Sequence, residues 1–329
     1  MDRVRIGRLV SLGWPSPTVT VGNFDGVHRG HQALVSSAVA RARESGGVSV
    51  VLTFDPHPAR VLGPGRAPAA LTTLAQKEEL LARLGVDRLA VLPFDAAVAR
   101  LPPAAFAREV LRGTLGAGHV VVGESFRFGH GREGDARLLA ALGEDLGFTV
   151  RAMPPVLEEG APVSSSRVRD ELGRGDVRTA RALLGRPYFV DAPVVRGDGR
   201  GRTIGVPTAN LVPENEILPA RGVYAARCRV GAGAWHPAVV NLGHRPTFGG
   251  THASVEAHLI DFEGDLYGSR VRLEFHEHLR AEQRFGSTEA LVARIRKDVA
   301  QARALLSGPG GEGYSSGEPW PTDDRTLRR

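Results

Sequence analysis

The sequence predicts two folds in tandem: a doubly wound α/β domain, followed by a small antiparallel β-barrel that one helix closes. Up to about residue 185, short apolar strands alternate with helical stretches. From there to about residue 283, apolar and polar residues alternate, and a single helical stripe follows. We therefore expect domains at residues 1–185 and 186–306, and a disordered tail at residues 307–329.

The strands of the first domain are predicted from five segments rich in Val, Leu and Phe, at residues 18–24, 48–54, 87–94, 118–126 and 148–155. They do not alternate, so we expect each to be buried on both faces of a parallel sheet. Helical stretches lie between or after them, at residues 31–47, 73–85, 102–116, 135–147, 167–175 and 177–185. Ligands of such folds bind outside the carboxyl ends of the strands.

The strands of the second domain are predicted from alternation. Residues 221–230 place Tyr224 and Cys228 on one face and Arg227 on the other, and residues 269–279 alternate in the same way. One polar face indicates an antiparallel sheet, and several such strands in about 100 residues suggest a barrel. The closing helix is predicted from an apolar stripe of Leu291, Ile295, Val299, Ala302 and Leu306.

Composition limits the classes of function. The formal charge of +6 and the pI of about 10.1 allow nucleic acid or small anions as ligands. No basic run is interleaved with aromatic residues, which argues against a nucleic-acid partner. The single cysteine, Cys228, excludes an internal disulfide and is expected to be inert packing, and the run 276–278 (His-Glu-His) is expected to be solvated. No apolar stretch approaches the length of a membrane span, and we find no secretion signal, so we expect a cytoplasmic protein without a membrane partner.

The segment from Val19 to Val35, VTVGNFDGVHRGHQALV, has the clearest signature of a site in the first domain. A strand ends near Phe24 and a helix follows, so the first helical amides should point at the loop, where phosphate is favoured. His28 and His31 can project to one side of the helix start and hydrogen-bond phosphate oxygens. The alternative is a pair of turn histidines, which we would favour for either histidine alone.

A serine cluster forms a second phosphate-site signature before another short helix. Ser164, Ser165 and Ser166 precede that helix, and Arg169 lies in its first turn. One serine would serve as the helix N-cap. A cap does not require three hydroxyl groups and a guanidinium, so we interpret the cluster as a phosphate site.

A third stretch, residues 195–215, interleaves glycines with arginines in its first half and then contains Pro-Thr-Ala-Asn at residues 207–210. A flexible basic hairpin is one interpretation, and a flap that closes over phosphates is the other. Thr208 and Asn210 share a face of an extended segment, and their hydroxyl and amide oxygens suit Mg²⁺.

These motifs resemble a known family. The His-x-Gly-His run at the first strand-to-helix turn is the signature of the nucleotidylyltransferase superfamily. The longer GNFDGVHRGHQ resembles the prokaryotic bifunctional riboflavin kinase/FMN adenylyltransferases, as do residues 51–58, 122–135 and 163–172. In the second domain, Gly-Val-Pro-Thr-Ala-Asn at residues 205–210 resembles the hallmark of riboflavin kinase domains. The resemblance covers about residues 5–306 and implies a Rossmann-like nucleotidylyltransferase domain before a riboflavin kinase-like barrel.

For the first domain, the resemblance implies adenylyl transfer from ATP to FMN, giving FAD and pyrophosphate, with Mg²⁺. The implied catalytic residues are His28, His31 and Arg169. The implied nucleotide-binding residues are Gly22, Asn23, Phe24, Asp25, Gly26, Ser164, Ser165 and Ser166. The family commonly has Asn or Asp where this chain has Ser125, which is implied to bind flavin with a shorter reach. The attacking phosphate is already ionised, so no general base is required.

For the second domain, the resemblance implies phosphorylation of riboflavin to FMN by a second ATP. Glu256 would be the general base, although without the surrounding motifs we would interpret it as a polar residue that faces solvent on a strand. The implied metal ligands are Thr208 and Asn210. The implied nucleotide-binding residues are Gly199, Gly201, Arg202 and Gly205, and Arg280 and Phe285 would contact flavin or the flap.

Two other functions are compatible with parts of the sequence. A basic barrel behind a nucleotide domain is compatible with an RNA- or tRNA-acting protein, but the absence of interleaved aromatic residues argues against it. A flavin-binding module without catalysis is supported only by Ser125. Small-molecule partners (riboflavin, FMN and ATP) therefore remain the prediction.

Overall fold

The computed structural model describes residues 1–63, 65, 67–197, 201, 204–247 and 250–307. Contacts divide the chain into two compact units, the first ending at Ser164 and the second beginning at Ser165. The boundary predicted at residues 185/186 is later than this division and stays a prediction. The tail predicted at residues 307–329 lies, apart from Ser307, outside the described residues.

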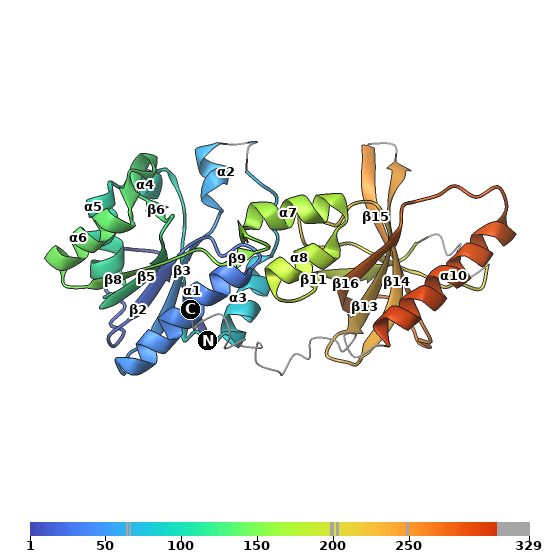
Figure 1. The fold of residues 1–329 in the computed structure, drawn as a ribbon, viewed down its shortest axis with the longest axis horizontal. Coiled ribbons are helices and arrows are strands. Elements are labelled where there is room, and N and C mark those ends of the chain that lie inside the picture. The colour runs from blue at the N-terminus through green and yellow to red at the C-terminus, as the bar shows by residue number, and fades with distance from the viewer. Residues whose placement is uncertain (64, 66, 198–200, 202–203, 248–249, 308–329) are drawn as a thin grey trace. The chain divides into compact units, whose positions relative to one another are not determined.

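The first unit is built on a six-stranded parallel sheet (Figure 1). Its strands, in chain order, are β1 (Asp2–Arg5), β2 (Thr18–Val21), β3 (Ser49–Phe54), β4 (Arg88–Leu92), β5 (His119–Gly123) and β8 (Thr149–Met153). In the sheet they follow the order β1-β4-β3-β2-β5-β8. The direction of winding reverses between β2 and β5, so the carboxyl ends of these two strands form the switch point where ligands bind in such folds.

Helices cover this sheet, and the longer ones follow the predicted apolar stripes. They are α1 (Arg29–Glu44), α2 (Pro58–Leu62), α3 (Leu74–Arg83), α4 (Ala96–Ala99), α5 (Pro103–Ala105), the π-helix η1 (Phe106–Thr114), the 3₁₀-helix η2 (His130–Arg132) and α6 (Ala136–Leu146). Short hairpin strands complete the unit: β6 (Arg127–Phe128) with β7 (Gly134–Asp135), and β9 (Leu157–Glu158) with β10 (Ala161–Pro162). α1 contacts β2, β3 and β5, so its N-terminus lies beside the switch point.

Three features of the first unit differ from the sequence prediction. β8 is an edge strand that pairs only with β5, and most of its residues are exposed, so it is not buried on both faces. β1 was missed because its sequence, DRVR, is mostly charged, which an edge position tolerates. The helix expected at residues 102–116 is the short α5 followed by η1.

The second unit is a closed antiparallel barrel with helices at both chain ends. α7 (Ser165–Arg174) and α8 (Val177–Leu184) precede it, and α8 contacts two of its strands. The strand order is β11-β12-β15-β14-β13-β16. The bounds are β11 (Tyr188–Val195), β12 (Ala209–Leu211), β13 (Gly222–Val230), β14 (Trp235–Thr247), β15 (Gly250–Leu259) and β16 (Arg270–Arg280).

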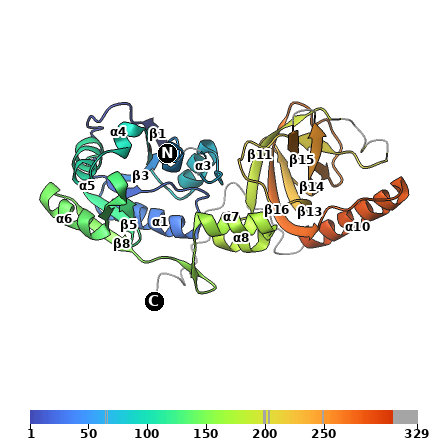
Figure 2. The same cartoon turned by 90° about the horizontal axis from the view of Figure 1, so that it is seen from above.

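The C-terminal helix α10 (Thr288–Leu306) covers one face of the barrel (Figure 2). It packs on β13 and β14, where Val223, Ala225 and Val239 form a small core with its Ala302 and Leu306. The first two residues of the predicted stripe, Leu291 and Ile295, are only half-buried because they line a cavity.

The interior of the barrel holds the predicted apolar faces. Cys228 is fully buried, and burial raises the pKa of its thiol to about 12, which agrees with inert packing. The His-Glu-His run was expected to be solvated, and this was wrong for His276, which is buried next to the buried Glu274 at 3.7 Å. Alternation alone cannot distinguish a strand face that faces water from one covered by neighbouring elements.

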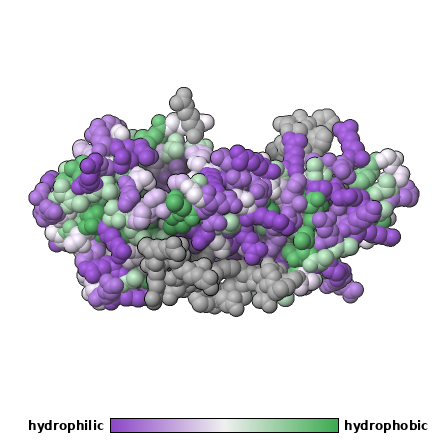
Figure 3. Space-filling view, viewed as in Figure 1, coloured by the Kyte–Doolittle hydropathy of each residue, from purple (hydrophilic) through white to green (hydrophobic). Residues whose placement is uncertain are grey.

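No helix within the described residues is long and apolar enough to cross a membrane. Hydrophilic residues dominate the face shown in Figure 3, where apolar residues form only small separate patches.

Candidate active sites

The first candidate site is the loop between β2 and α1, at the switch point of the sheet. β2 ends at Val21 and α1 begins at Arg29, so the predicted residues 22–28 form the connection. On the neighbouring strand β5, the chain turns just after Gly123, and Ser125 is exposed in that turn. The fold therefore brings the predicted loop and Ser125 to adjacent carboxyl strand ends.

His28 and His31 lie together as the spacing predicted. Their rings stack with centroids 3.6 Å apart and planes 17° apart. His28 is the N-cap of α1, and its Nδ1 accepts a hydrogen bond from the His31 backbone N–H at 3.3 Å. Gly30 makes this stacking feasible, because a Cβ there would lie 3.2 Å from the His28 ring. Both imidazoles are thereby fixed at the positive end of a helix.

The charge state of His31 is set by its surroundings. Burial lowers its pKa well below 6.5, and the neighbouring His28 and Lys77 lower it further. At neutral pH the His31 ring is therefore neutral in the free protein. A neutral imidazole can donate one N–H to a phosphate oxygen.

The loop itself is held in an unusual backbone conformation. Phe24 and Val27 have φ values of 46° and 43°, and a left-handed conformation is rare for a β-branched residue. The Asp25 carboxylate stabilises the loop by accepting backbone N–H groups of Leu71 and Thr72 at 3.0–3.2 Å. Strain held by surrounding contacts is typical of functional loops.

The predicted nucleotide-binding residues of this loop have different surroundings. Asp25 and the ring of Phe24 are buried, and Phe24 packs against His31 at 5.2 Å between centroids. Their side chains therefore support the loop and the histidines. Gly22 and Asn23 are half-buried, and Gly26 has a φ of 79° that favours glycine. Direct contact of this loop with nucleotide stays a prediction.

The serine cluster falls at the junction of the two units. Ser164 closes the first unit, whereas Ser165, Ser166 and Arg169 belong to α7 of the second. Ser166 is exposed, and Ser165 and Arg169 are half-buried. Their joint action with the histidine pair stays a prediction.

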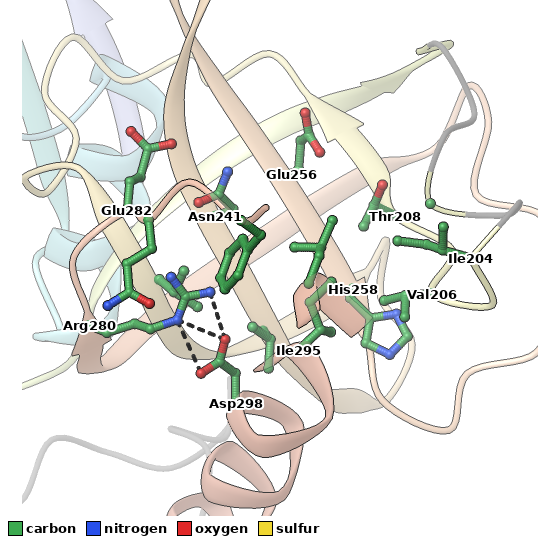
Figure 4. A pocket seen from close by; sticks show the side chains of 16 residues that line it. Ile204, Val206, Thr208, Asn241, Glu256, His258, Arg280, Glu282, Ile295 and Asp298 are labelled. Carbon is green, nitrogen blue, oxygen red and sulfur yellow. Dashed lines mark hydrogen bonds and ion pairs between the residues drawn. The ribbon is translucent and has the colours of Figure 1, made fainter. Parts of the chain in front are cut away.

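The second candidate site is a cavity of about 380 Å³ between the barrel and α10 (Figure 4). Four predicted residues line it from separate elements: Thr208, Glu256, Arg280 and Phe285. Gly201 lines it as well, whereas the predicted Gly199 and Arg202 lie outside the described residues. Its volume is in the range of small-molecule pockets.

Glu256 stands in a row of polar residues across three strands. It is directly opposite Asn210 of β12 on one side and Asn241 of β14 on the other. Directly paired residues of antiparallel strands share a face, so Glu256 lies on the same face of the sheet as these two asparagines. The neighbours Val255 and Ala257 are buried on the other face, as the alternation predicted.

Two glycines of the predicted flap pack on the predicted metal ligands. A Cβ at Gly197 would lie 2.0 Å from Nδ2 of Asn210, and one at Gly201 would lie 3.1 Å from the Thr208 hydroxyl. A side chain at Gly201 would also clash with the backbone oxygen of Val206, whereas one at Gly197 would displace the Asn210 amide. Gly205 differs, since it is exposed and its role is conformational, with a φ of 74°.

Arg280 is fixed by α10. Its guanidinium donates to the carboxylate of Asp298 through Nε at 2.9 Å and Nη2 at 2.8 Å, and it lies 5.8 Å from the centroid of the Phe285 ring. Asp298 is 1% exposed and also accepts from Arg294. Figure 4 shows the Arg280–Asp298 pair at the wall of the cavity.

A smaller cavity of about 70 Å³ lies next to the first, and Thr208 lines both. Its walls include Pro207, Phe262 and Tyr267, and the guanidinium of Arg196 stands 5.8 Å from the centroid of the Tyr267 ring. No sequence pattern predicted this cavity.

Several other residues at these sites were missed. The sequence did not identify Asn241 and Asp298, because the position of each at the site depends on packing against an element that is distant in the sequence. Lys77 could have been identified from the sequence, because it stands in the apolar stripe of its helix, three and four residues before Leu80 and Leu81.

Comparisons with known proteins match both units. The family model of FAD synthetase matches residues 14–167, and that of riboflavin kinase matches residues 184–306. A bifunctional riboflavin kinase/FMN adenylyltransferase of Pseudomonas fluorescens is 43% identical over 289 residues, covering 88% of this chain and 92% of that protein. Proteins of the same name from Escherichia coli K12 and Bacillus subtilis are 40% and 37% identical at the same coverage.

A solved structure extends this similarity to the fold. The crystal structure of a Streptococcus pneumoniae protein named as a macrolide-efflux protein has a TM-score of 0.86 and 32% identity, and the match covers 92% of this chain and 99% of that one. Both family models lie in the predicted order, and the relatives match across both units. The chain belongs to the family of bifunctional riboflavin kinase/FMN adenylyltransferases.

Proposed function

We propose that two separate sites catalyse two consecutive reactions, riboflavin phosphorylation at the barrel cavity and FMN adenylylation at the histidine loop. The main observation in support of this division is the cavity of the second unit. It brings Glu256, Thr208 and Arg280 together from distant segments, with an apolar wall from α10. We place both reactions in the cytoplasm, because each consumes ATP.

In the kinase reaction, Glu256 takes the proton of the riboflavin 5′-hydroxyl. The hydroxyl oxygen then bonds to the γ-phosphorus of ATP, the bond to the β-phosphate oxygen breaks, and ADP leaves. The amides of Asn210 and Asn241 flank the carboxylate and orient it. Leu291 and Ile295 supply apolar surface for the flavin ring.

The hydroxyl of Thr208 and the amide oxygen of Asn210 fit Mg²⁺, which prefers oxygen ligands. Asn210 is paired with Glu256 across the strands, and Thr208 lines the same cavity as Glu256. The flap glycines at 197 and 201 approach the side chains of Asn210 and Thr208 closely. When bound, Mg²⁺ would neutralise phosphate charge. The smaller cavity, with Phe262 and Tyr267, is suited to the adenine ring, because it joins the larger cavity at Thr208.

In the adenylylation reaction, an FMN phosphate oxygen bonds to the α-phosphorus of a second ATP. The bond to the β-phosphate oxygen breaks, and pyrophosphate leaves. His28 and His31 hydrogen-bond the phosphate oxygens, and Arg169 with Ser164, Ser165 and Ser166 would hold the β- and γ-phosphates. Positioning and charge stabilisation suffice, because the attacking group is already ionised.

A product assay tests the proposal. The purified protein is incubated with riboflavin, ATP and Mg²⁺, and the flavins are separated by chromatography. We expect FMN and then FAD. The Glu256→Gln variant, which keeps the size of the side chain, should lose FMN formation and keep conversion of added FMN to FAD. Equal loss of both reactions in a folded variant would contradict the division.

A further inference from the structure

Lys77 is unusual in this chain before any contact is considered. Of the 42 lysine and arginine residues, two are lysines and 40 are arginines. One lysine, Lys297, is exposed on α10. The other, Lys77, is 9% exposed on α3, in the unit that carries the histidine pair. A buried ammonium is costly unless it is paired.

The contacts of Lys77 lead to the histidine loop. Its Nζ donates to the Thr53 hydroxyl at 3.4 Å, and that hydroxyl donates to the backbone oxygen of Asn23 at 3.2 Å. Thr53 lies near the carboxyl end of β3, and Asn23 is in the loop between β2 and α1. The ammonium is therefore connected to the loop through a single hydroxyl.

Lys77 has no carboxylate within ion-pair distance in the part of the chain that the structure describes. Asp25 and Asp55 are near enough to act on its charge, but Asp25 accepts the backbone N–H groups of Leu71 and Thr72. Asp55 is paired with Arg5 at 3.3 Å. Burial lowers the pKa of Lys77 below its usual value, and the charges of Asp25 and Asp55 offset this only in part. The ammonium makes one hydrogen bond with its three N–H donors.

This charge acts on the histidine pair. Lys77 and His28 are the charged or titratable groups that act on His31, and both lower its pKa in addition to burial. Because His28 already uses Nδ1 to accept the His31 backbone N–H, it must leave that nitrogen unprotonated. The positive end of α1 disfavours protonation of either ring as well.

We propose that Lys77 is a positioning residue of the adenylylating site, whose buried ammonium supports the histidine loop through the Thr53 hydroxyl and keeps the His31 ring neutral beside His28. A neutral His31 ring stays stacked on His28 without charge repulsion. It remains able to donate a hydrogen bond when a polyphosphate enters. The inference rests on the proposed role of the histidine pair in FMN adenylylation.

The first test compares Lys77→Met with Lys297→Met, which removes the exposed lysine as a matched control. For Lys77→Met we expect kcat of FMN adenylylation to fall by about one order of magnitude. The acid limb of its pH profile should move to higher pH, while riboflavin phosphorylation is unchanged. The melting temperature of the variant should not be lower than that of the wild type, because the substitution removes a buried, poorly paired ammonium. The proposal would be overturned if the adenylylation activity of Lys77→Met fell only in proportion to a loss of its stability.

The second test measures the charges directly by NMR. In protein labelled with ¹³C at the lysine Cε, only two lysine signals are expected, so Lys77 can be assigned with the Lys77→Met variant. Lys77 must be charged at neutral pH in the wild type. The histidine ring signals, with His31 assigned through His31→Gln, should show a higher pKa for His31 in Lys77→Met and an unchanged one in Lys297→Met.

The outcomes separate this inference from the proposed function. An unchanged His31 pKa in Lys77→Met, or a Lys77 that is uncharged at neutral pH, overturns the role of Lys77 alone. If the variant does not fold, Lys77→Arg keeps the charge and should keep the low His31 pKa. Full FAD formation by a His28→Asn/His31→Gln double variant would instead overturn the proposed function of the histidine pair.

Discussion

At the scale of single residues, the first site depends on side chains that hold the loop rather than face a ligand. Asp25, Phe24 and Gly30 each support the position of a histidine or of the loop backbone. The sequence identified these residues as part of a site, because glycines and an aspartate at a strand-to-helix turn are typical of phosphate loops. The sequence could not distinguish residues that support the loop from residues that contact a ligand, because the support of Asp25 depends on residues 71 and 72, which are distant in the sequence.

Replacing Asp25 by Asn tests this support. The amide keeps one acceptor oxygen but turns an N–H₂ group toward the backbone N–H groups of Leu71 and Thr72. We expect the free energy of unfolding to fall by about 1–3 kcal/mol, together with FAD formation. Urea unfolding measures the first effect, and Asp170→Asn, at an exposed position, is the control. An Asp25→Asn variant as stable as the wild type would show that these bonds do not hold the loop.

The lowered pKa of His31 gives a pH dependence with a definite sign. Above about pH 6.5, His31 is neutral in both the folded and the unfolded chain and contributes nothing. As the pH falls below that value, the unfolded chain takes up the proton first, so stability declines until the folded pKa is passed. Thermal melts at a series of pH values should show a flatter acid decline for His31→Gln than for the wild type. His130→Gln, at an exposed position, should keep the decline.

At the scale of elements, the second site is assembled by packing of a helix on a sheet. The row Asn210–Glu256–Asn241 follows from strand register, and Arg280 follows from its pairing with Asp298 of α10. Alternation in the sequence predicted the face of Glu256 correctly. It could not give the register between strands, which is why Asn241 and Asp298 were missed.

The Arg280–Asp298 pair should matter for both stability and riboflavin binding. Asp298→Asn leaves the buried part of the Arg280 guanidinium without its counter-charge, and breaking a buried pair costs about 3–5 kcal/mol. We expect lower stability of the second unit and a higher KM for riboflavin, with conversion of FMN to FAD unchanged. Steady-state kinetics with each substrate checks this, and a normal KM for riboflavin would contradict it.

The flap glycines give a second prediction at this scale. A Cβ at Gly201 would lie 2.2 Å from the backbone oxygen of Val206, so Gly201→Ala must displace the flap from Thr208. We expect loss of riboflavin phosphorylation in a folded protein. Gly286→Ala is the control, because nothing lies within 4 Å of its added Cβ and its φ is not positive. Equal kinase rates in the two variants would show that the flap does not act at Thr208.

At the scale of the whole molecule, the order of the two folds could be predicted because local patterns change abruptly near residue 186. Alternating strands and helices give way there to period-two strands, and each pattern follows from local burial. The exact division of contacts could not be predicted, since α7 and α8 have helical patterns that fit either unit. The edge strands β1 and β8 were misjudged for a related reason, because an exposed edge lacks the apolar signal of a central strand.

The measurement that tests the account most directly is a mixing experiment with two single-site proteins. Glu256→Gln should convert FMN but not riboflavin, and the His28→Asn/His31→Gln double variant should stop at FMN. Incubated together with riboflavin and ATP, the two proteins are expected to form FAD, because FMN released by one can be adenylylated by the other. Loss of both activities in each variant, or no FAD from the mixture, would contradict two separate sites in one chain.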